Sequence, residues 1–455
     1  ASSYGKDVSE GSGVPEVPSI PSVQDFNSLS PPPMLESNNL PQLEITLSGS
    51  LAPKIEGSHL ELMQGPENTI AHFKTFNIGQ GYTVHVRQHP HTHALFRVTG
   101  QQDISRIDGT LKADANLYLV TPNGLLIGKN GILDVGNLVL TTHPITDESF
   151  LAFSQRQMLD LAEVYRPHAG IINKGTIKAA GFAALVAPII VNEGLIQGNV
   201  LMGSGAQANL AVGENDLVQL RVSGTLKKTL IAQASKGKIS AQGKKVVITA
   251  GDVERAADGI INLQGTIDAS DGVIVVEGRR NIEEKISASL SVEGTAGKGG
   301  TIYLKSPTMT VGKTAVLNAR SQQGEGGKIH VLGDNIYIKG DGNRGALLDA
   351  SGQEGGGEIL IGGNYRGKGP EPNAQYLKIE DGVQMKADAL SDGNAGTIIN
   401  YASLDAILWG KTSAQALGAT GDGGYIEYSG KRSLSFPRER DYWPKLTKRN
   451  GNPGK

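Results

Sequence analysis

The hydrophobic pattern along most of the chain is that of short β-strands. Between residues 115 and 142, apolar and polar residues alternate in runs of four to six, and turn signals separate the runs at 122–124, 129–131 and 135–137. Alternation with a period of two predicts half-buried strands, and Asn-Gly pairs supply the backbone angles of tight turns. Strands this short cannot bury a face alone. The pattern therefore predicts a solenoid, in which each coil stacks on similar coils.

From residue 170 onward the repeats become explicit. The segment 173–177 (NKGTI) recurs as 192–196 (NEGLI), and loosely at 262–267 (NLQGTI). These are predicted to be stacking turns. The side-chain amides of Asn173 and Asn192 satisfy backbone groups from coil to coil, while Gly175 and Gly194 take the left-handed conformation.

A second repeat follows, in which a glycine precedes an alternating strand. It occurs at Gly300, Gly327, Gly357, Gly396 and Gly424, with separations of 27, 30, 39 and 28 residues. The varying separation indicates that loops take up insertions while the strand core is kept.

One segment, residues 143–168, interrupts the strand pattern. Within it, residues 150–165 place apolar side chains at helical spacing, Asp147 or Ser149 is available as N-cap, and Pro167 follows the end. We expect a short helix that lies against the side of the solenoid.

Composition supports tightly turned β-structure. Glycine contributes 61 of 455 residues, aromatic residues 5% and charged residues 19%, which favours thin layers of small side chains. A net charge of −2 gives no electrostatic basis for binding nucleic acid. The chain has no cysteine, which fits transit through an oxidising periplasm as well as it fits chance. No apolar run approaches the roughly 18 residues of a membrane span.

The two ends differ from the repeats. Residues 1–42 are rich in Ser and Pro and are expected to be disordered or extended. A plain tether is favoured over an arm that adds a strand to a neighbouring subunit. Residues 432–455 are basic and are interpreted as a solvated tail or a C-terminal cap. The start at Ala1 fits a mature form from which a signal peptide has been removed.

The segment 116–128 (NLYLVTPNGLLIG) resembles the secretion signature of filamentous-haemagglutinin-type exoproteins, the exported partner in two-partner secretion. The hallmark of that family is Asn-Pro-Asn-Gly-Ile, and this chain has Thr121 in place of the first Asn and Leu125 in place of the Ile. Further matches lie in the family's order at 73–78, 97–100, 107–109 and 137–142, and the stretches 348–363 and 423–431 resemble large haemagglutinin-type adhesins. The resemblance covers about residues 44–431.

This resemblance implies an all-β fold: a right-handed parallel β-helix with an N-terminal secretion-domain cap and a short helical insertion. Residues 43–205 would form the two-partner-secretion domain and residues 206–431 continuing repeats. It also implies export from a Gram-negative bacterium, via the periplasm, by an outer-membrane β-barrel transporter whose periplasmic domains recognise the exoprotein. By the resemblance, the residues that the transporter recognises are Asn116, Pro122, Asn123 and Gly124. The alternative is that they only build the turn.

Four histidines in residues 84–96 (VHVRQHPHTHALF) are the one candidate metal or haem site. They are His85, His89, His91 and His93, with His91 and His93 expected on one face of a strand. No acidic residue stands beside them in the sequence, and Pro90 favours a solvated loop over a specific site. No cofactor is therefore expected. The segment 340–345 matches G-x-G-x-x-G, but a strand follows it, so it is interpreted as a turn.

Catalysis is not expected. The acidic residues lie mostly in turn contexts, no carboxylate recurs at coil spacing, and no nucleophile elbow is present. The predicted role is that of a secreted, surface-associated adhesin that binds a host or neighbouring-cell receptor. Two alternatives stay open: a self-assembling filament or matrix subunit that polymerises through residues 1–42, and a haem or metal carrier.

Overall fold

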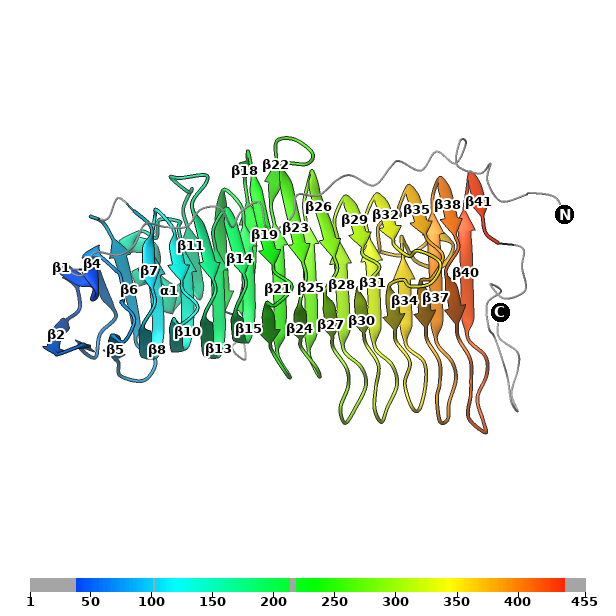
Figure 1. Ribbon diagram of the computed structural model, residues 1–455, viewed down its shortest axis with the longest axis horizontal. Coiled ribbons are helices and arrows are strands. Elements are labelled where there is room, and N and C mark those ends of the chain that lie inside the picture. The colour runs from blue at the N-terminus through cyan, green and yellow to red at the C-terminus, as the bar shows by residue number, and fades with distance from the viewer. Residues whose placement is uncertain (1–37, 101–102, 213–217, 438–455) are drawn as a thin grey trace. The chain divides into compact units, whose positions relative to one another are not determined.

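The computed structural model describes residues 38–100, 103–212 and 218–437, which fold almost entirely as β-strands (Figure 1). These residues form two compact units: an amino-terminal unit of residues 38–241 and 246–266, and a carboxy-terminal unit of residues 242–245 and 267–437. Within each unit the strands stack in parallel from coil to coil. The predicted all-β parallel β-helix is confirmed.

Two parallel sheets form the amino-terminal unit. In sheet A1 the early coils contribute two short strands each, and later coils fuse these into one long, bent strand. The members of A1 are β3 (His59–Gln64), β4 (Thr69–Thr75), β5 (Thr83–Arg87), β6 (His93–Val98), β8 (Thr110–Val120), β10 (Ile132–Thr141), β13 (Thr176–Val186), β15 (Leu195–Ser204), β20 (Lys238–Ser240) and β21 (Lys245–Ala250).

The second sheet, B1, is built from shorter strands, each paired in parallel with the next coil. Its members are β7 (Ser105–Ile107), β9 (Leu125–Ile127), β12 (Gly170–Asn173), β14 (Ile189–Asn192), β19 (Thr229–Gln233) and β23 (Gly259–Leu263). A small additional pair is formed by β18 (Thr225–Leu226) and β22 (Asp252–Val253). Side chains alternate between the interior of the coil and the outer face of each sheet.

The first two strands cap this unit. Strand β1 (Gln42–Ser48) pairs antiparallel with β4, and β2 (Leu51–Glu56) pairs antiparallel with β3. An antiparallel strand ends the parallel stack and occupies the edge that a coil would otherwise leave open. This is the predicted N-terminal cap.

The helical insertion is present but shorter than expected. Helix α1 spans Asp147–Arg156, and its N-cap is Thr146, whose Oγ1 accepts from the Ser149 amide at 3.1 Å, rather than Asp147 or Ser149. The residues after it form strand β11 (Met158–Leu161), which joins β16 (Gln207–Val212) and β17 (Val218–Ser223) in an antiparallel sheet. The expectation of a helix to residue 165 was wrong, because this antiparallel pairing captures residues 158–161.

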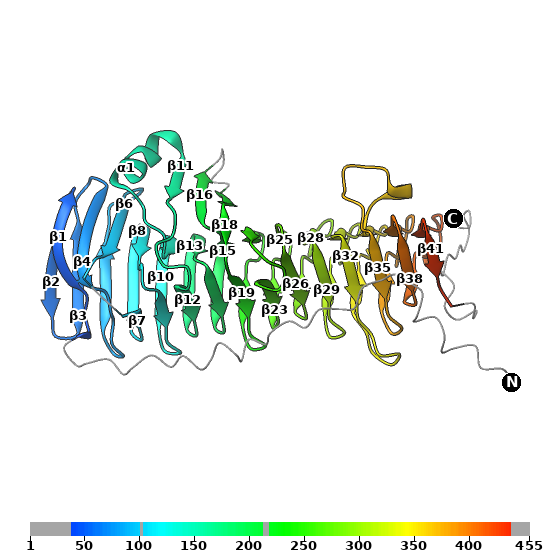
Figure 2. The ribbon, with the colours of Figure 1, turned by 90° about the horizontal axis from the view of Figure 1, so that it is seen from above.

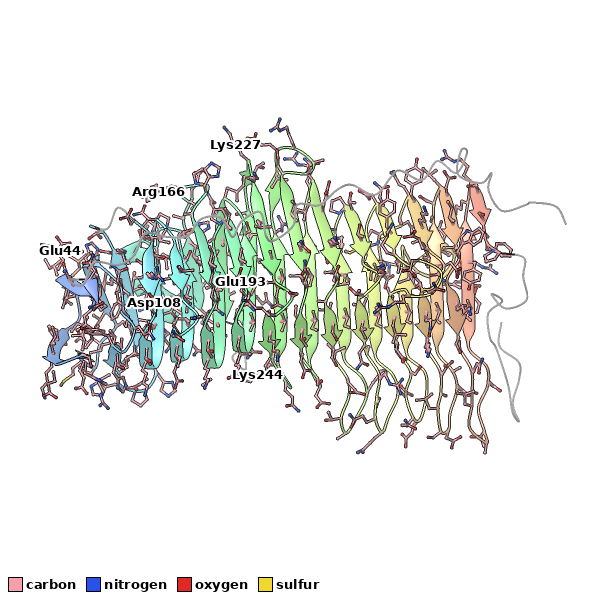
Figure 3. The ribbon with its side chains drawn as sticks, viewed as in Figure 1. Glu44, Asp108, Arg166, Glu193, Lys227 and Lys244 are labelled. Atoms are coloured by element: carbon pink, nitrogen blue, oxygen red, sulfur yellow. The ribbon has the colours of Figure 1, made fainter. Side chains whose placement is uncertain are left out.

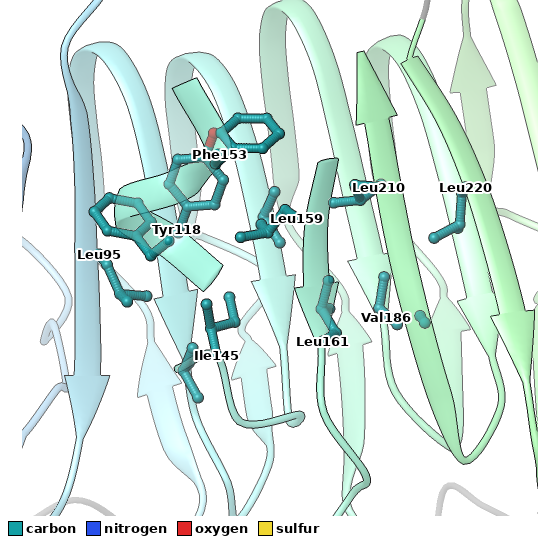
Figure 4. Close-up of a cluster of buried hydrophobic side chains, with 14 of the residues drawn as sticks. Leu95, Tyr118, Ile145, Phe153, Leu159, Leu161, Val186, Leu210 and Leu220 are labelled. Atoms are coloured by element: carbon teal, nitrogen blue, oxygen red, sulfur yellow. The ribbon is translucent and has the colours of Figure 1, made fainter. Parts of the chain in front are cut away.

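The insertion packs on the outside of sheet A1, as the sequence predicted. Figure 4 shows the apolar cluster between them, in which Phe153 of the helix and Leu159 of β11 meet Tyr118 of the sheet. Tyr118 and Phe150 make an edge-on ring contact with centroids 5.4 Å apart, a favoured geometry for aromatic pairs.

The carboxy-terminal unit has three strand columns. The first contains β25 (Val273–Gly278), β28 (Thr301–Lys305), β31 (Lys328–Leu332), β34 (Glu358–Ile361), β37 (Thr397–Ala402) and β40 (Tyr425–Gly430). The second contains β26 (Ile282–Ile286), β29 (Thr308–Val311), β32 (Asn335–Ile338), β35 (Tyr376–Ile379), β38 (Asp405–Leu408) and β41 (Ser433–Ser435). The third contains β27 (Ser289–Ser291), β30 (Val316–Asn318), β33 (Leu347–Asp349), β36 (Gln384–Lys386) and β39 (Lys411–Ser413), and β24 (Thr266–Asp268) precedes it.

The glycine repeat marks the first of these columns. The strands β28, β31, β34, β37 and β40 begin directly after the five repeated glycines, as predicted. The one larger excursion contains the 3₁₀ turn η4 (Tyr365–Gly367). The segment 340–345 is a turn closed by an isolated bridge between Gly340 and Gly345. Among the described residues, no helix is long and apolar enough to cross a membrane.

Two sequence-based interpretations fall mainly outside the described residues. They are the tether or strand-donating arm of residues 1–42, of which 38–42 are described, and the basic tail or cap of residues 432–455, of which 432–437 are described. The boundary at residues 205 and 206 stays a prediction.

Candidate functional site

The candidate secretion motif forms a tight turn between β8 and β9. The amide of Gly124 donates to the Thr121 carbonyl at 2.9 Å and closes the turn over Pro122 and Asn123. Proline at the second position of such a turn supplies the required φ. Pro122 and Asn123 are half-buried, so part of the turn's surface is open to solvent.

Neighbouring coils hold the turn on both sides. The Thr121 amide donates to the Thr141 carbonyl at 2.9 Å, and the Ser105 amide donates to the Gly124 carbonyl at 3.0 Å. Gly124 has a φ of 107°, and a Cβ there would lie 2.8 Å from the Gly170 carbonyl oxygen. Glycine is therefore required at this position by conformation and by space.

Thr121 stands where the family signature has an asparagine. Its side chain is 2% exposed, and within the described residues its hydroxyl has no hydrogen-bond partner. A buried hydroxyl without a partner costs free energy. The departure from the signature therefore leaves a local energetic cost in the turn.

Asn116 lies apart from the turn, at the bend of β8, and belongs to an amide ladder. Its Nδ2 donates to the Thr92 carbonyl at 3.0 Å, and its Oδ1 accepts from Asn137 Nδ2 at 2.8 Å. Asn137 Oδ1 in turn accepts from the Phe182 amide at 2.8 Å. Both side-chain groups of Asn116 therefore bind neighbouring coils, which gives this residue a role in folding. The structure brings Pro122, Asn123 and Gly124 together and leaves Asn116 separate.

The predicted stacking turns form a second amide ladder, inside sheet B1. Asn173 Nδ2 donates to Asn192 Oδ1 at 2.9 Å, and Asn192 Nδ2 donates to Gln233 Oε1 at 2.9 Å. Both asparagines are fully buried. At the end of the ladder, Gln233 Nε2 donates to the carbonyls of Gln264 and Thr266. The coil-to-coil role predicted for Asn173 and Asn192 is seen directly in these contacts.

Two details of that prediction were wrong. Gly175 and Gly194 do not have positive φ. They are needed because a Cβ at Gly194 would lie 2.0 Å from the Gly175 carbonyl oxygen, and one at Gly175 would lie 2.3 Å from that of Gly131. The loose repeat at 262–267 is also out of register, because the residue paired with Gln233 is Leu263 rather than Asn262.

The histidine cluster does not form a loop site. His85 lies in β5 and His93 in β6, and His91 occupies a left-handed turn position with a φ of 65°. His91 and His93 therefore do not share a strand face, contrary to expectation. His85 Nε2 lies 2.7 Å from Asp114 Oδ1, so an acidic neighbour exists although the local sequence contains none.

The side chain of His93 is engaged in contacts within the fold. Its Nδ1 lies 2.8 Å from the Tyr118 hydroxyl, and Phe153 meets its ring edge-on. Burial lowers the pKa of His93 to about 4, so the ring is neutral at physiological pH. Across the described residues, no three His, Cys, Asp or Glu side chains are placed to hold a metal ion.

A polar pocket of about 380 Å³ lies beside the amide ladder of Asn116. One of its lining residues is Gln88, which the sequence reasoning missed. Gln88 Nε2 donates to Gln64 Oε1 at 2.9 Å and to the Asn116 carbonyl at 3.0 Å, and Gln88 Oε1 accepts from the Ala115 amide at 2.8 Å. A glutamine in a turn carries no local signal for this role, since its three partners lie 24–28 residues away.

Comparison with known proteins agrees with this geometry. The family model for the TPS secretion domain matches residues 54–302, more than half of the chain. The HMW1 secretion domain from Haemophilus influenzae has a similar fold, with a TM-score of 0.63 and 22% identity over 91% of this chain and 100% of that chain.

Two curated relatives are heme/hemopexin-binding proteins of Haemophilus influenzae. One is 27% identical over 40% of this chain and 21% of its own length, and the other is 33% identical over 23% of this chain and 11% of its own length. The chain thus spans about a fifth or less of the relatives it matches. Membership of the family implies a partner transporter in the outer membrane and export to the cell surface or beyond. On the family match and the turn at residues 121–124, the chain belongs to the TPS secretion domain family of two-partner secretion exoproteins.

Proposed function

We propose that this chain directs its own export through the turn at residues 121–124, and that the exported β-helix acts as an adhesin at the cell surface. The observation that carries the first part is the turn itself. Gly124 is fixed by space, while Pro122 and Asn123 keep exposed surface. A rigid turn with partly exposed residues is the kind of feature that a partner can recognise.

The contacts of the motif support different roles for its residues. Asn116 bonds to neighbouring coils through both of its side-chain groups, and Gly124 leaves no space for a Cβ, so changes there act on folding first. Pro122 and Asn123 are half-buried, so a transporter domain can contact part of their surface. We therefore assign recognition to Pro122 and Asn123.

Secretion assays with the partner transporter test this assignment. Asn123→Ala is expected to lower the amount of exoprotein in the medium at least tenfold, while the purified, refolded variant keeps its β-sheet circular dichroism. The matched control is Asn130→Ala, an exposed asparagine in the turn 129–131 of the same unit, which should leave secretion unchanged. Equal loss in both variants, or loss of fold in Asn123→Ala, would overturn the recognition role.

The adhesive role has support in the loops of the carboxy-terminal unit. Loops at residues 293–300, 319–327, 350–357, 387–396 and 414–424 follow one another along one edge (Figure 1), and isolated bridges link them between Ser321, Gly352 and Ala389. Such a row repeats polar side chains at coil spacing. Binding of the purified exoprotein to cultured epithelial cells should fall when these loop tips are exchanged for Gly-Ser sequences of equal length. Undiminished binding would remove the loops from the proposal.

Haem carriage is a second candidate, supported by the names of the two curated relatives. The histidines of this chain do not converge, and His93 is bonded to Tyr118. We therefore expect no Soret band shift when hemin is added to the chain. A shift that disappears in a His89→Ala, His91→Ala double variant would restore the carrier function.

The filament alternative depends on residues 1–42, of which 1–37 lie outside the described residues. Electron microscopy of the secreted protein and of a variant without residues 1–37 distinguishes a filament subunit from an adhesin. Filaments that vanish on truncation would replace the adhesin with a polymer subunit.

A further inference from the structure

The excursion that contains η4 folds back over the first strand column of the carboxy-terminal unit. It follows β34, and Figure 2 shows it projecting beyond the strands between the labels β32 and β35. The Arg366 amide donates to the carboxylate oxygens of Glu427 in β40, at 3.2 and 3.0 Å. A Cβ at Gly367 would collide with the hydroxyl end of the Tyr401 ring in β37. The excursion is therefore fixed on two later coils of the same unit.

Aromatic rings and cations meet where the excursion touches these coils. The rings of Tyr365 and Tyr425 are in edge-on contact with centroids 5.5 Å apart, and Tyr365 is 41% exposed. The guanidinium carbon of Arg366 lies 5.0 Å from the centre of the Tyr365 ring, and Lys431 Nζ lies 5.7 Å from that of Tyr401. Both distances allow cation–π contacts, which position the cations without neutralising their charge.

Three cations here have no acidic partner. Arg366, Lys368 and Lys431 are exposed, and none of them forms an ion pair with another described residue. By contrast, Lys305 and Lys313 of the same unit lie 3.9 and 3.2 Å from carboxylates. The three unpaired cations, with Tyr365 and Tyr425, are named the tyrosine–cation patch.

The acids nearest to the patch are already engaged by the fold. Glu427 is 7% exposed and accepts from the Ser429 hydroxyl at 2.7 Å, in addition to its bonds with the excursion. Glu371 Oε2 accepts from Asn364 Nδ2 at 2.9 Å. The buried hydroxyl of Tyr401 has no hydrogen-bond partner within the described residues. The surface therefore holds a surplus of donors, which is what an anionic ligand requires.

We propose that the tyrosine–cation patch binds sugar rings that carry an anionic group. The face of a pyranose ring is apolar and packs on an exposed tyrosine ring, while carboxylate, sulfate or phosphate oxygens accept from guanidinium and ammonium groups. Tyrosine and arginine are also the residue types that often dominate binding at protein surfaces. A nucleic acid fits less well, because the net charge of −2 gives no electrostatic basis for holding a long phosphate backbone.

The proposal deepens the adhesive function proposed above, on which it rests for its biological role, by naming a class of receptor. Binding of the full-length exoprotein to immobilised polymers tests it. Dextran sulfate, polygalacturonate and phosphorylated mannan present three anionic groups on sugar rings, dextran presents rings without charge, and polyacrylate presents charge without rings. At least one of the first three should bind at least tenfold more tightly than dextran and polyacrylate, and the preferred one identifies the anionic group.

Two pairs of charge variants separate this patch from overall charge. Arg366→Gln combined with Lys431→Gln removes two unpaired cations and should weaken binding at least tenfold. Lys305→Gln combined with Lys313→Gln removes the same charge from paired positions and should change binding less than twofold. Equal weakening in both pairs, tight binding to polyacrylate, or equally tight binding to a single-stranded oligothymidine would overturn the proposal.

The tyrosine ring is tested separately. Tyr365→Ala should weaken binding of the preferred polysaccharide at least fivefold, whereas Tyr365→Phe should keep it, because the ring rather than the hydroxyl makes the contact. Both variants should unfold at the wild-type urea concentration, since Tyr365 is exposed. An unchanged affinity in Tyr365→Ala, or an equal loss in Tyr365→Phe, would remove the sugar ring from the proposal and overturn it.

These measurements contain no cells, so they separate the patch from the adhesive role. Loss of polysaccharide binding with undiminished binding to epithelial cells would remove the patch as the receptor site and keep the adhesin. Intact polysaccharide binding without any binding to cells would remove the adhesin and keep the patch.

Discussion

The turns of both units stack glycines at close approach, and the turns of the amino-terminal unit add an amide ladder to that stack. In the amino-terminal unit, side-chain amides of Asn173, Asn192 and Gln233 bond to each other across coils. In the carboxy-terminal unit the glycine stack forms the contact between the turns that precede the first strand column. A Cβ at Gly327 would lie 2.0 Å from the Gly300 carbonyl oxygen, and one at Gly357 would lie 2.0 Å from that of Gly327.

This difference sets what each unit tolerates. An amide ladder depends on specific donors and acceptors, so losing one member leaves its neighbours unsatisfied but leaves space. A glycine column has no space, so any side chain must displace the backbone of the coil below. We expect a substitution in the glycine column to cost more stability than the loss of one member of the amide ladder.

The largest effect should come from Gly357→Ala. Its methyl group would meet the Gly327 carbonyl oxygen and the Gly326 carbonyl carbon, which are backbone atoms inside a paired stack. Overpacking that moves backbone costs about 3 kcal/mol or more. Urea unfolding should show the loss, with faster hydrogen exchange in β31 and β34.

The control is Gly297→Ala in the same unit. Nothing lies within 4 Å of a Cβ at that position, so the change should stay within about 0.5 kcal/mol. If the two alanine variants unfold at the same urea concentration, close approach is not what requires glycine in this column.

Next in size is Asn192→Ala, which removes the middle of the amide ladder. In a buried site, Gln233 Oε1 would lose the Asn192 donor, and Asn173 Nδ2 would keep only the Leu195 carbonyl as acceptor. Leaving buried polar groups unsatisfied costs about 2 kcal/mol. The destabilisation should be smaller than for Gly357→Ala, and hydrogen exchange should rise in β12, β14 and β19 only. A larger loss than at Gly357 would reverse the proposed order.

Sequence could predict this repeat chemistry in part. The five glycine–strand units were recognisable because the glycine and the alternation recur together. Asn173 and Asn192 were recognisable because they lie 19 residues apart in similar pentapeptides. Gln233 was missed because it lies 41 residues further on and uses a longer amide. The contact of His85 with Asp114 was also out of reach, since only the coil stacking brings residues 29 apart together.

Glu284 was missed although the sequence contained the signal. Alternation over Ile282–Ile286 places Glu284 inside with the two isoleucines, and the structure finds it fully buried in register with Met309. Its Oε2 accepts from the Ser306 hydroxyl at 2.5 Å. Burial raises the pKa of Glu284 well above its usual range, which favours the neutral acid in the folded state.

A third prediction follows from this raised pKa. The folded state binds the proton more tightly than the unfolded state, so stability is greatest below about pH 4.5 for this group and falls as pH rises toward the folded pKa. The slope for one proton is at most about 1.4 kcal/mol per pH unit. Glu284→Gln keeps a partner for Ser306 and should remove that slope, as urea unfolding at several pH values would show. An unchanged slope would mean that the carboxylate is charged in the folded state.

The smallest effect is expected at the same turns as the amide ladder, but on their outer side. Lys174 and Glu193 occupy the middle of the two stacked turns, and Lys174 Nζ lies 3.8 Å from Glu193 Oε2. Glu193 is labelled in Figure 3. The lysine side chain is 40% exposed, so solvent screens the pair and Lys174→Gln should cost about 0.5 kcal/mol. That loss should shrink further in 0.5 M salt, whereas the loss in Asn192→Ala should not, because hydrogen bonds between neutral amides are not screened. Equal losses in the two variants would place the stacking energy in the charges rather than in the amide ladder.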